Sequence, residues 1–327
     1  MIDGERKSQK PIDSPNSVEA TEQTNTDVET PIALEYDESE ADTGAVEGES
    51  AFSPADQIAC LTLDLENDWY FDEDGYDHLT FEYLDDFVAL VGDLDVPLTV
   101  FVVGKTLEKY PEAIDRLWSE LDCEFHLHSY RHDTSKSYDF REEVRLGSEA
   151  FREHFESNPV GYRAPQGNID PPEFRILEEE GFRFDSSVFP SYRPGVYNNI
   201  DAPREPYVPE PAEGLMEIPI GTTSLGRVPT SHSYLKLIGR PYLSYLRRGP
   251  LPDLLVYNVH LHDLYRTKSY ERLPRMKRFA YERNIGKAPH LFDTVVNLLR
   301  NRGYSFVKIT DVFETYKPAV HRQQVSR

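Results

Sequence analysis

The stretch Ile58-Ala-Cys-Leu-Thr-Leu-Asp64 decides the fold. It alternates like a β-strand, and acidic side chains follow its apolar part at Asp64, Glu66 and Asp68, with Trp69 next. Functional groups of parallel barrels gather where the strands end, so an apolar strand that runs into carboxylates is typical of a barrel mouth. The stretch therefore predicts the first strand of a parallel barrel.

Strand-like and helix-like segments alternate along the rest of the chain. Helical periodicity predicts helices over 80–93, 106–120, 138–157, 171–180, 234–248 (interrupted at Gly239-Arg-Pro241) and 289–302. Apolar runs between them predict strands over 97–103, 160–163, 216–220, 254–263 and 304–309. This order favours the α/β class and a parallel (β/α) barrel. Residues 190–215, rich in Pro and Tyr, are expected to form a binding loop.

Composition divides the chain into two parts. Residues 1–56 hold 15 acidic and three basic residues with almost no apolar run, which is typical of a disordered acidic tail. Residues 57–327 are expected to form one barrel domain. The net charge of −23 disfavours nucleic acid as a partner. With 24 Arg, only 11 Lys and this excess of acid, the composition favours a halophilic protein, although a merely acidic protein is the alternative.

The sequence also bears on compartment. No run approaches the ~20 apolar residues of a membrane helix. The N-terminus lacks a basic region followed by an apolar core, so we expect a cytoplasmic protein that acts in the cytosol or at the inner face of the membrane. Cys60 and Cys123 lie in apolar contexts and are predicted to be reduced thiols.

A second stretch, Glu124-Phe-His-Leu-His-Ser-Tyr-Arg-His132, carries two candidate metal ligands. If a helical turn follows the strand, His128 and His132 lie at i and i+4 on one face and can reach one divalent cation. Two histidines make an incomplete catalytic site, so a third ligand must come from elsewhere. Taken alone, this spacing is also common among histidines with no metal.

Five segments, in order, resemble the NodB-type polysaccharide deacetylases, the fourth carbohydrate esterase family. They are Thr62-Leu-Asp64-Leu-Glu66, His128-Ser-Tyr-Arg-His132, Arg163-Ala-Pro165-Gln-Gly167, Asp185-Ser-Ser-Val-Phe-Pro190 and Leu261-His262-Asp263. The resemblance covers most of residues 57–312. The run from Asp185 to Pro190 and the later Asp201-Ala-Pro-Arg204 are similar to the branch associated with exopolysaccharide and surface-glycan gene clusters, here expected to be haloarchaeal.

The resemblance implies a distorted parallel (β/α) barrel that removes N-acetyl groups from a sugar or glycan with one divalent metal ion. Such chemistry needs an activated water, a base and an acid for the departing amine. Asp64 suits the base and His262 the acid. By resemblance, Arg163 pairs with Asp64, and Asp185 holds the catalytic histidine in its cationic form.

Two assignments depart from the family pattern and stay open. The carboxylate ligand is expected to be Glu66, which shares the strand parity of Asp64, with Asp68 as the alternative. The acid is expected to be His262, with His260, predicted to point to the same side, as a pocket residue. The metal set Glu66–His128–His132 suits Zn²⁺, while Co²⁺, Ni²⁺ or Fe²⁺ are chemically possible.

Aromatic residues near the motifs predict the substrate wall. Trp69, Tyr162, Tyr192 and Tyr197 are candidates for stacking on a sugar, with Pro165 beside them, although aromatics near a barrel mouth are also ordinary packing. Two other functions compete with deacetylation of a glycan. One is a barrel amidohydrolase acting on a small non-sugar amide or cyclic ureide, and the other is a non-catalytic glycan-binding homologue.

Overall fold

The computed structural model describes residues 52–66 and 79–325. Most of the predicted acidic tail lies outside the described residues, and so do Asp68 and Trp69. Within the described part, Phe52 packs against buried residues of the domain, and the carbonyl of Pro54 accepts a hydrogen bond from the Tyr316 hydroxyl at 3.4 Å. Residues 52–56, which we assigned to the tail, therefore contact the domain.

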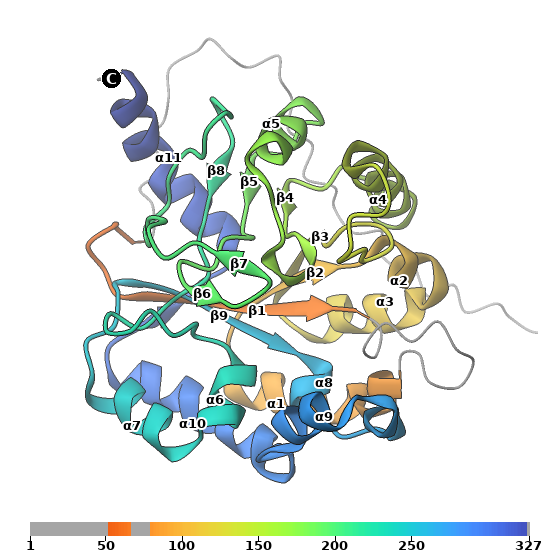
Figure 1. Ribbon diagram of the computed structural model, residues 1–327, viewed down its shortest axis with the longest axis vertical. Coiled ribbons are helices and arrows are strands. Elements are labelled where there is room, and N and C mark those ends of the chain that lie inside the picture. The colour runs from red at the N-terminus through yellow and green to blue at the C-terminus, as the bar shows by residue number, and fades with distance from the viewer. Residues whose placement is uncertain (1–51, 67–78, 326–327) are drawn as a thin grey trace, which may run out of the picture. The chain divides into compact units, whose positions relative to one another are not determined.

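The strands form one curled parallel sheet (Figure 1). Its members are β1 (Ile58–Leu65), β2 (Leu98–Val102), β3 (Cys123–Leu127), β4 (Gly161–Tyr162), β5 (Phe184–Asp185), β8 (Met216–Glu217), β9 (Leu254–His260) and β10 (Ser305–Phe306). The order is β10-β1-β2-β3-β4-β5-β8, and β9 pairs with β1. The segment after β8 reaches β9, because the Gly221 amide donates to the Val256 carbonyl at 2.9 Å. The predicted barrel is confirmed as a half-barrel of this kind.

Helices cover the sheet. They are α1 (Leu84–Leu94), α2 (Gly104–Lys109), α3 (Pro111–Glu120), α4 (Phe140–Phe155), α5 (Pro171–Glu179), α6 (His232–Ile238), α7 (Arg240–Arg248), α8 (Leu261–Leu264), α9 (Arg275–Glu282), α10 (Ala288–Asn301) and α11 (Ile309–Val325). Short 3₁₀ turns lie at Leu79–Tyr83, Pro165–Gly167, Lys268–Arg272 and Ile285–Lys287, and a hairpin pairs β6 (Tyr192–Arg193) with β7 (Tyr197–Asn198). No helix among the described residues is both long and apolar enough to cross a membrane.

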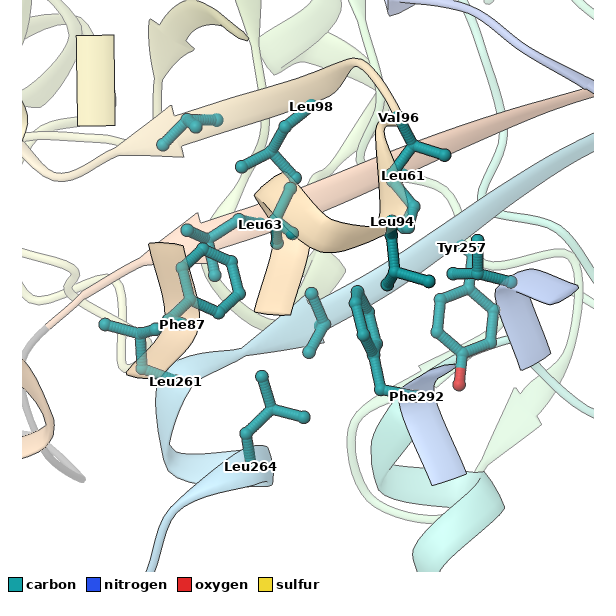
Figure 2. Packing of buried hydrophobic residues seen from close by; sticks show 14 of the residues in the cluster. Leu61, Leu63, Phe87, Leu94, Val96, Leu98, Tyr257, Leu261, Leu264 and Phe292 are labelled. Atoms are coloured by element: carbon teal, nitrogen blue, oxygen red, sulfur yellow. The ribbon is translucent and has the colours of Figure 1, made fainter. Parts of the chain in front are cut away.

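One face of the long strands packs on helices. Alternate residues of β1, such as Leu61 and Leu63, are buried in the same cluster as Tyr257 of β9. Figure 2 shows these side chains directed toward Phe87 and Leu94 of α1 and Phe292 of α10. The period of two along a strand thus sends every second residue into this outer core.

The other face lines the inside of the half-barrel. Ile58 and Cys60 of β1 and Val256 of β9 pack there with residues of α11, which closes one end. This end is the floor. The inward positions that follow them, Thr62 and Asp64, are polar, and they lead to the opposite end, the mouth, where the parallel strands end.

The structure corrects several predicted elements. The helix expected over 106–120 is two helices, because Pro111 cannot continue the hydrogen bonding of α2. The strand expected over 304–309 is only Ser305–Phe306, and the chain then enters α11, which we did not predict. Cys60 and Cys123 are both free thiols, as expected.

Candidate active site

The inward residues of β1 and β9 meet at the mouth. The parallel register sets Thr62 beside Asn258 and Asp64 beside His260. Both strands run in the same direction, so their last inward side chains reach the same level. Nε2 of His260 consequently lies 3.5 Å from Oδ2 of Asp64.

Arg163, immediately after β4, holds Asp64 from across the half-barrel. Its Nη1 donates to Oδ1 of Asp64 at 2.7 Å and to Oγ1 of Thr62 at 2.8 Å. Nε and Nη2 donate to the carbonyl and hydroxyl of Ser186 at 2.8 and 2.9 Å. Burial alone would raise the pKa of Asp64, but the positive charge around it, that of Arg163 foremost, holds the pKa below its ordinary value. The carboxylate is therefore ionised and oriented.

The two predicted metal ligands of the histidine segment leave β3 without forming a helical turn. His128 follows the strand directly, and the chain then passes through left-handed backbone at Ser129 (φ 63°) and His132 (φ 58°). The hydroxyl of Ser129 accepts a hydrogen bond from the His132 amide at 3.0 Å and stabilises this loop. The i, i+4 helical geometry that we expected is wrong, yet the ring centroids of the two histidines lie 4.9 Å apart.

Glu66, His128 and His132 converge as buried donors. Oε2 of Glu66 lies 2.8 Å from Nε2 of His132 and 3.5 Å from Nε2 of His128. Nδ1 of His128 is 2.8 Å from the Arg163 carbonyl, which only accepts, so Nδ1 donates to that carbonyl and Nε2 faces the carboxylate. This donor set fits a divalent metal ion, and the three residues could hold one.

A second histidine pair faces Glu66 from the other side. β9 ends at His260, and His262 lies on the short helix α8 rather than on the strand. The strand that we expected to continue to residue 263 ends at His260, but the two histidines do point to the same side, as expected. Their rings stack at 4.6 Å, and Nδ1 of His262 lies 3.7 Å from Oε1 of Glu66. Glu66, His260 and His262 form a second group that could contribute to a metal site.

Asp263 supports His260. Its Oδ2 lies 2.9 Å from Nδ1 of His260, and its Oδ1 lies 3.3 Å from Nζ of Lys236. The Ser233 hydroxyl donates to both oxygens, at 2.7 and 2.8 Å. Burial alone would lower the pKa of His260, but Glu66 and Asp263 raise it to about 9. Burial, and next the charge of His260, lower the pKa of His262 to about 3. The two histidines are therefore not equivalent.

Asp185 does not support His262, contrary to the expectation from resemblance. Its carboxylate accepts hydrogen bonds from the hydroxyl and amide of Ser187 at 2.6 and 3.1 Å. The register of β5 and β8 sets it opposite Glu217, also fully buried. Burial and the charge of Asp185 raise the pKa of Glu217 well above its ordinary value, so the pair retains a proton. Because the Ser187 hydroxyl accepts from the Ala164 amide at 2.7 Å, the pair instead holds the turn after Arg163.

These residues open into a cavity of ≈ 280 Å³ at the mouth. Its lining includes Asp64, Glu66, Arg163, His260 and His262 together with side chains of the β6–β7 hairpin, α6 and α9. The Arg163–Gly167 turn forms part of the wall. Gly167 has a φ of +66°, and a Cβ there would lie 2.6 Å from the Ser187 carbonyl, so only glycine fits.

The predicted aromatic wall is mostly wrong. Tyr162 is a core residue that packs edge-on against Phe182, because its β4 position points away from the inside. Pro165 is buried beside the cavity and does not line it, and Tyr192 is 60% exposed outside it. Tyr197 does line the cavity.

Sequence reasoning missed five residues near the site. Arg193 and Lys277 line the cavity, Lys236 and Asp263 surround the histidine pair, and Glu217 faces Asp185. Glu217 offered a signal, since an acidic residue interrupts the apolar run Met216–Ile220. Asp263 stands in the segment Leu261-His262-Asp263 but was given no role, and Arg193, Lys236 and Lys277 lie in segments without a motif, so only the fold brings them together.

Comparisons with known proteins agree with this arrangement. Residues 71–184, about a third of the chain, match the polysaccharide deacetylase family. No curated protein matches the sequence. This chain is therefore similar to the polysaccharide deacetylases through the matched segment.

Solved structures share the fold. Puue allantoinase has 14% identity and a TM-score of 0.57, covering 84% of this chain and 96% of its own. A candidate polysaccharide deacetylase of Mycobacterium smegmatis has 19% identity and a TM-score of 0.54, covering 82% and 91%. One of Pseudomonas aeruginosa PAO1 has 16% identity and a TM-score of 0.54, covering 84% and 97%. At these identities the likeness concerns the fold.

Proposed function

We propose that this protein is a metal-dependent hydrolase that removes N-acetyl groups from an N-acetylated sugar or glycan. The main observation is that three groups meet at the mouth of the half-barrel: an arginine-held carboxylate, a carboxylate–histidine cluster and a carboxylate-supported histidine. Binding alone does not require these three together, which argues against a non-catalytic homologue. The match of residues 71–184 to the polysaccharide deacetylases supports the reaction class.

Asp64 is the proposed base. Its low pKa keeps it ionised, and Arg163 fixes Oδ1 while Oδ2 remains directed toward the histidines. A carboxylate held in this way can take a proton from a water molecule as the water attacks the acetamide carbonyl. A divalent ion held by Glu66, His128 and His132, for which Zn²⁺ is the first choice, would supply Lewis-acid chemistry for that step.

His260 is the proposed acid, in place of His262. It lies beside Asp64 in the register of β1 and β9, and Asp263 accepts a hydrogen bond from its Nδ1. That bond holds the ring with Nε2 toward the cavity, where it can protonate the departing amine. His262 stacks on it and is assigned to the wall.

An acetate-release assay on purified protein tests the proposal. Asp64→Asn should retain the metal, measured by elemental analysis, and lower the rate by ~10²–10⁴-fold because the base is lost. Asp253→Asn, an exposed change at the opposite end of β9, is the matched control and should leave both unchanged. Asp64→Asn protein that releases acetate at the parent rate would contradict the assignment.

The substrate panel separates the competing functions. It should include N-acetylated sugars, small linear amides and a cyclic ureide. Release of product only from the last two would replace the glycan assignment with the small-amide alternative. Sugar binding without turnover of any compound would favour the non-catalytic homologue.

A further inference from the structure

α6 carries a lysine in the interior of the protein, where this residue is rarely found. Lys236 is 1% exposed, whereas the next residue of the helix, Leu237, is 41% exposed. The usual preference of lysine for water and of leucine for the core is therefore reversed at this turn. An ammonium group loses its water when it is buried, so it needs a partner that makes up for the loss.

The partner of Lys236 is Asp263, which is fully buried. Nζ of Lys236 lies 3.3 Å from Oδ1 of Asp263, and it also donates to the Tyr281 carbonyl at 3.3 Å. Lys236 forms part of the cavity wall, but these contacts direct its ammonium to Asp263 and to α9. The lysine thus serves a carboxylate of the protein rather than a ligand.

Asp263 divides its two oxygens between Lys236 and His260. Oδ1 faces the lysine, while Oδ2 lies 2.9 Å from Nδ1 of His260. Ser233, one turn before Lys236 on the same face of α6, donates to both oxygens at 2.7 and 2.8 Å. Two side chains of α6 therefore hold the carboxylate in the orientation in which it holds the His260 ring.

The His260 ring depends on this support because its other nitrogen faces the catalytic carboxylate. β9 ends at His260, and Nε2 of the ring lies 3.5 Å from Oδ2 of Asp64. Without Lys236, Oδ1 of Asp263 would lose its ionic partner in a buried site, which is costly. The carboxylate would then turn toward other donors, and the hydrogen bond that fixes the ring would change with it.

We propose that Lys236 is a positioning residue of the active site, which acts through Asp263 to hold the His260 ring with Nε2 toward Asp64. This inference rests on the proposed function, in which His260 protonates the departing amine. The contacts run from α6 to α8 and to the end of β9, three segments that the fold brings together. A lysine–aspartate pair that served the fold alone could be lost without a change at the His260 ring.

The ring proton on Nδ1 of His260 gives a readout that needs no substrate. Proton and nitrogen NMR of the Zn²⁺-loaded protein with labelled histidine should show this proton, held by Asp263 and protected from exchange with water, and His260→Gln identifies its signal. We expect Lys236→Met, which keeps the length of the side chain and removes the charge, to shift or abolish the signal. Lys236→Arg should retain part of it, because the charge returns beside Asp263.

Lys317→Met is the matched control. Lys317 is exposed on α11, so this variant loses the same charge away from the cavity and should keep the signal of the parent. A signal unchanged in Lys236→Met overturns the inference, and so does an equal change in Lys317→Met. Should Lys236→Met fail to fold, Lys236→Gln takes its place in the comparison.

Kinetics show whether the positioning serves catalysis. With N-acetylglucosamine as the probe, Lys236→Met should lower kcat by ~10–10²-fold and leave KM within ~2-fold, because the support acts on the transition state. Asp263→Asn should lower kcat as well. Adding Lys236→Met to Asp263→Asn should change kcat by no more than ~2-fold, because the lysine acts through the aspartate. Independent, additive effects overturn the inference.

The NMR readout separates this inference from the proposed function. An Nδ1 signal that depends on Lys236, without acetate release from any compound of the substrate panel, supports the positioning role and overturns the deacetylase assignment. Acetate release with the parent kcat in Lys236→Met does the opposite.

Discussion

The mouth of the half-barrel buries Glu66 and the floor half-buries Glu124, and the two carboxylates have different polar neighbours. At the floor, Oε1 of Glu124 accepts hydrogen bonds from the Thr99 hydroxyl at 2.7 Å and from the Ile309 and Thr310 amides at 2.8 and 3.2 Å. These amides begin α11, where the helix dipole favours a negative charge. At the mouth, Glu66 faces Nε2 of His132 at 2.8 Å and Nε2 of His128 at 3.5 Å.

The surroundings of each carboxylate indicate whether it serves the fold or the site. Burial alone would raise the pKa of Glu124, but His126 and the hydrogen bonds lower it to about 2. The groups around Glu124 therefore stabilise its charged form. Within the described residues, Glu66 is faced by imidazole nitrogens and no backbone amide donates to it, so its surroundings fit a shared cation. A carboxylate supplied with hydroxyl and backbone amide donors stabilises the fold, whereas one surrounded by histidines fits a metal site.

The largest effect is expected from Glu66→Gln. The change removes the charged ligand, so bound metal should be lost and acetate release should fall by at least ~10²-fold. Unfolding of the metal-free protein in urea should show no loss of stability, because no backbone amide of the described residues donates to the removed charge. Glu149→Gln, an exposed change on α4, controls for net charge.

The opposite result would change the roles assigned to Glu66 and Asp64. If Glu66→Gln retains the metal while Asp64→Asn sheds it, ligand and base are exchanged. A large loss of metal-free stability in Glu66→Gln would place Glu66 in the same class as Glu124.

The same substitution at the floor should act on stability instead. Glu124→Gln is expected to lower the free energy of unfolding by about 1–3 kcal/mol at pH 7, with activity near the parent value at a permissive temperature. Because the folded pKa of about 2 lies below the ordinary 4.5, this contribution is full above pH 4.5 and is lost as the pH falls through about 2. Urea unfolding of parent and variant from pH 7 to pH 3 measures it. A difference that does not shrink in acid would mean that the charge is not responsible.

The smallest effect is expected at the Asp185–Glu217 pair of β5 and β8. Since the folded pKa of Glu217 is raised, the unfolded chain releases a proton that the folded protein keeps, and stability is lost as the pH rises above 4.5. Glu217→Gln retains an acceptor for the Val188 amide, which donates to Glu217 at 2.9 Å, and needs no proton. We expect the melting temperature at pH 8 to rise by about 2–4 °C, with no gain at pH 4. Thermal unfolding at the two pH values checks this, and an unchanged melting temperature at pH 8 would show that the pair carries no such cost.

Much of the frame could be predicted from local pattern. Alternation in the β1 and β9 segments sorts residues into outer and inner faces, since a strand has a period of two. That period, with the motif order, predicted a parallel barrel and the meeting of Asp64, Arg163, Glu66, His128 and His132 at one end. Short polar stretches were less informative, because the path after His128 depends on left-handed backbone and not on a helical repeat.

Sequence alone thus determined which side chains point inward and that they gather where parallel strands end, because both follow from local backbone geometry. Tertiary structure alone decided their partners. Asp185 faces Glu217 because β5 and β8 are neighbours in that register. Asp263 contacts the His260 ring because the chain turns into α8 directly after β9. Arg193 reaches the cavity because a hairpin far along the chain carries it there. Pairing across elements depends on register and packing, which no local period encodes.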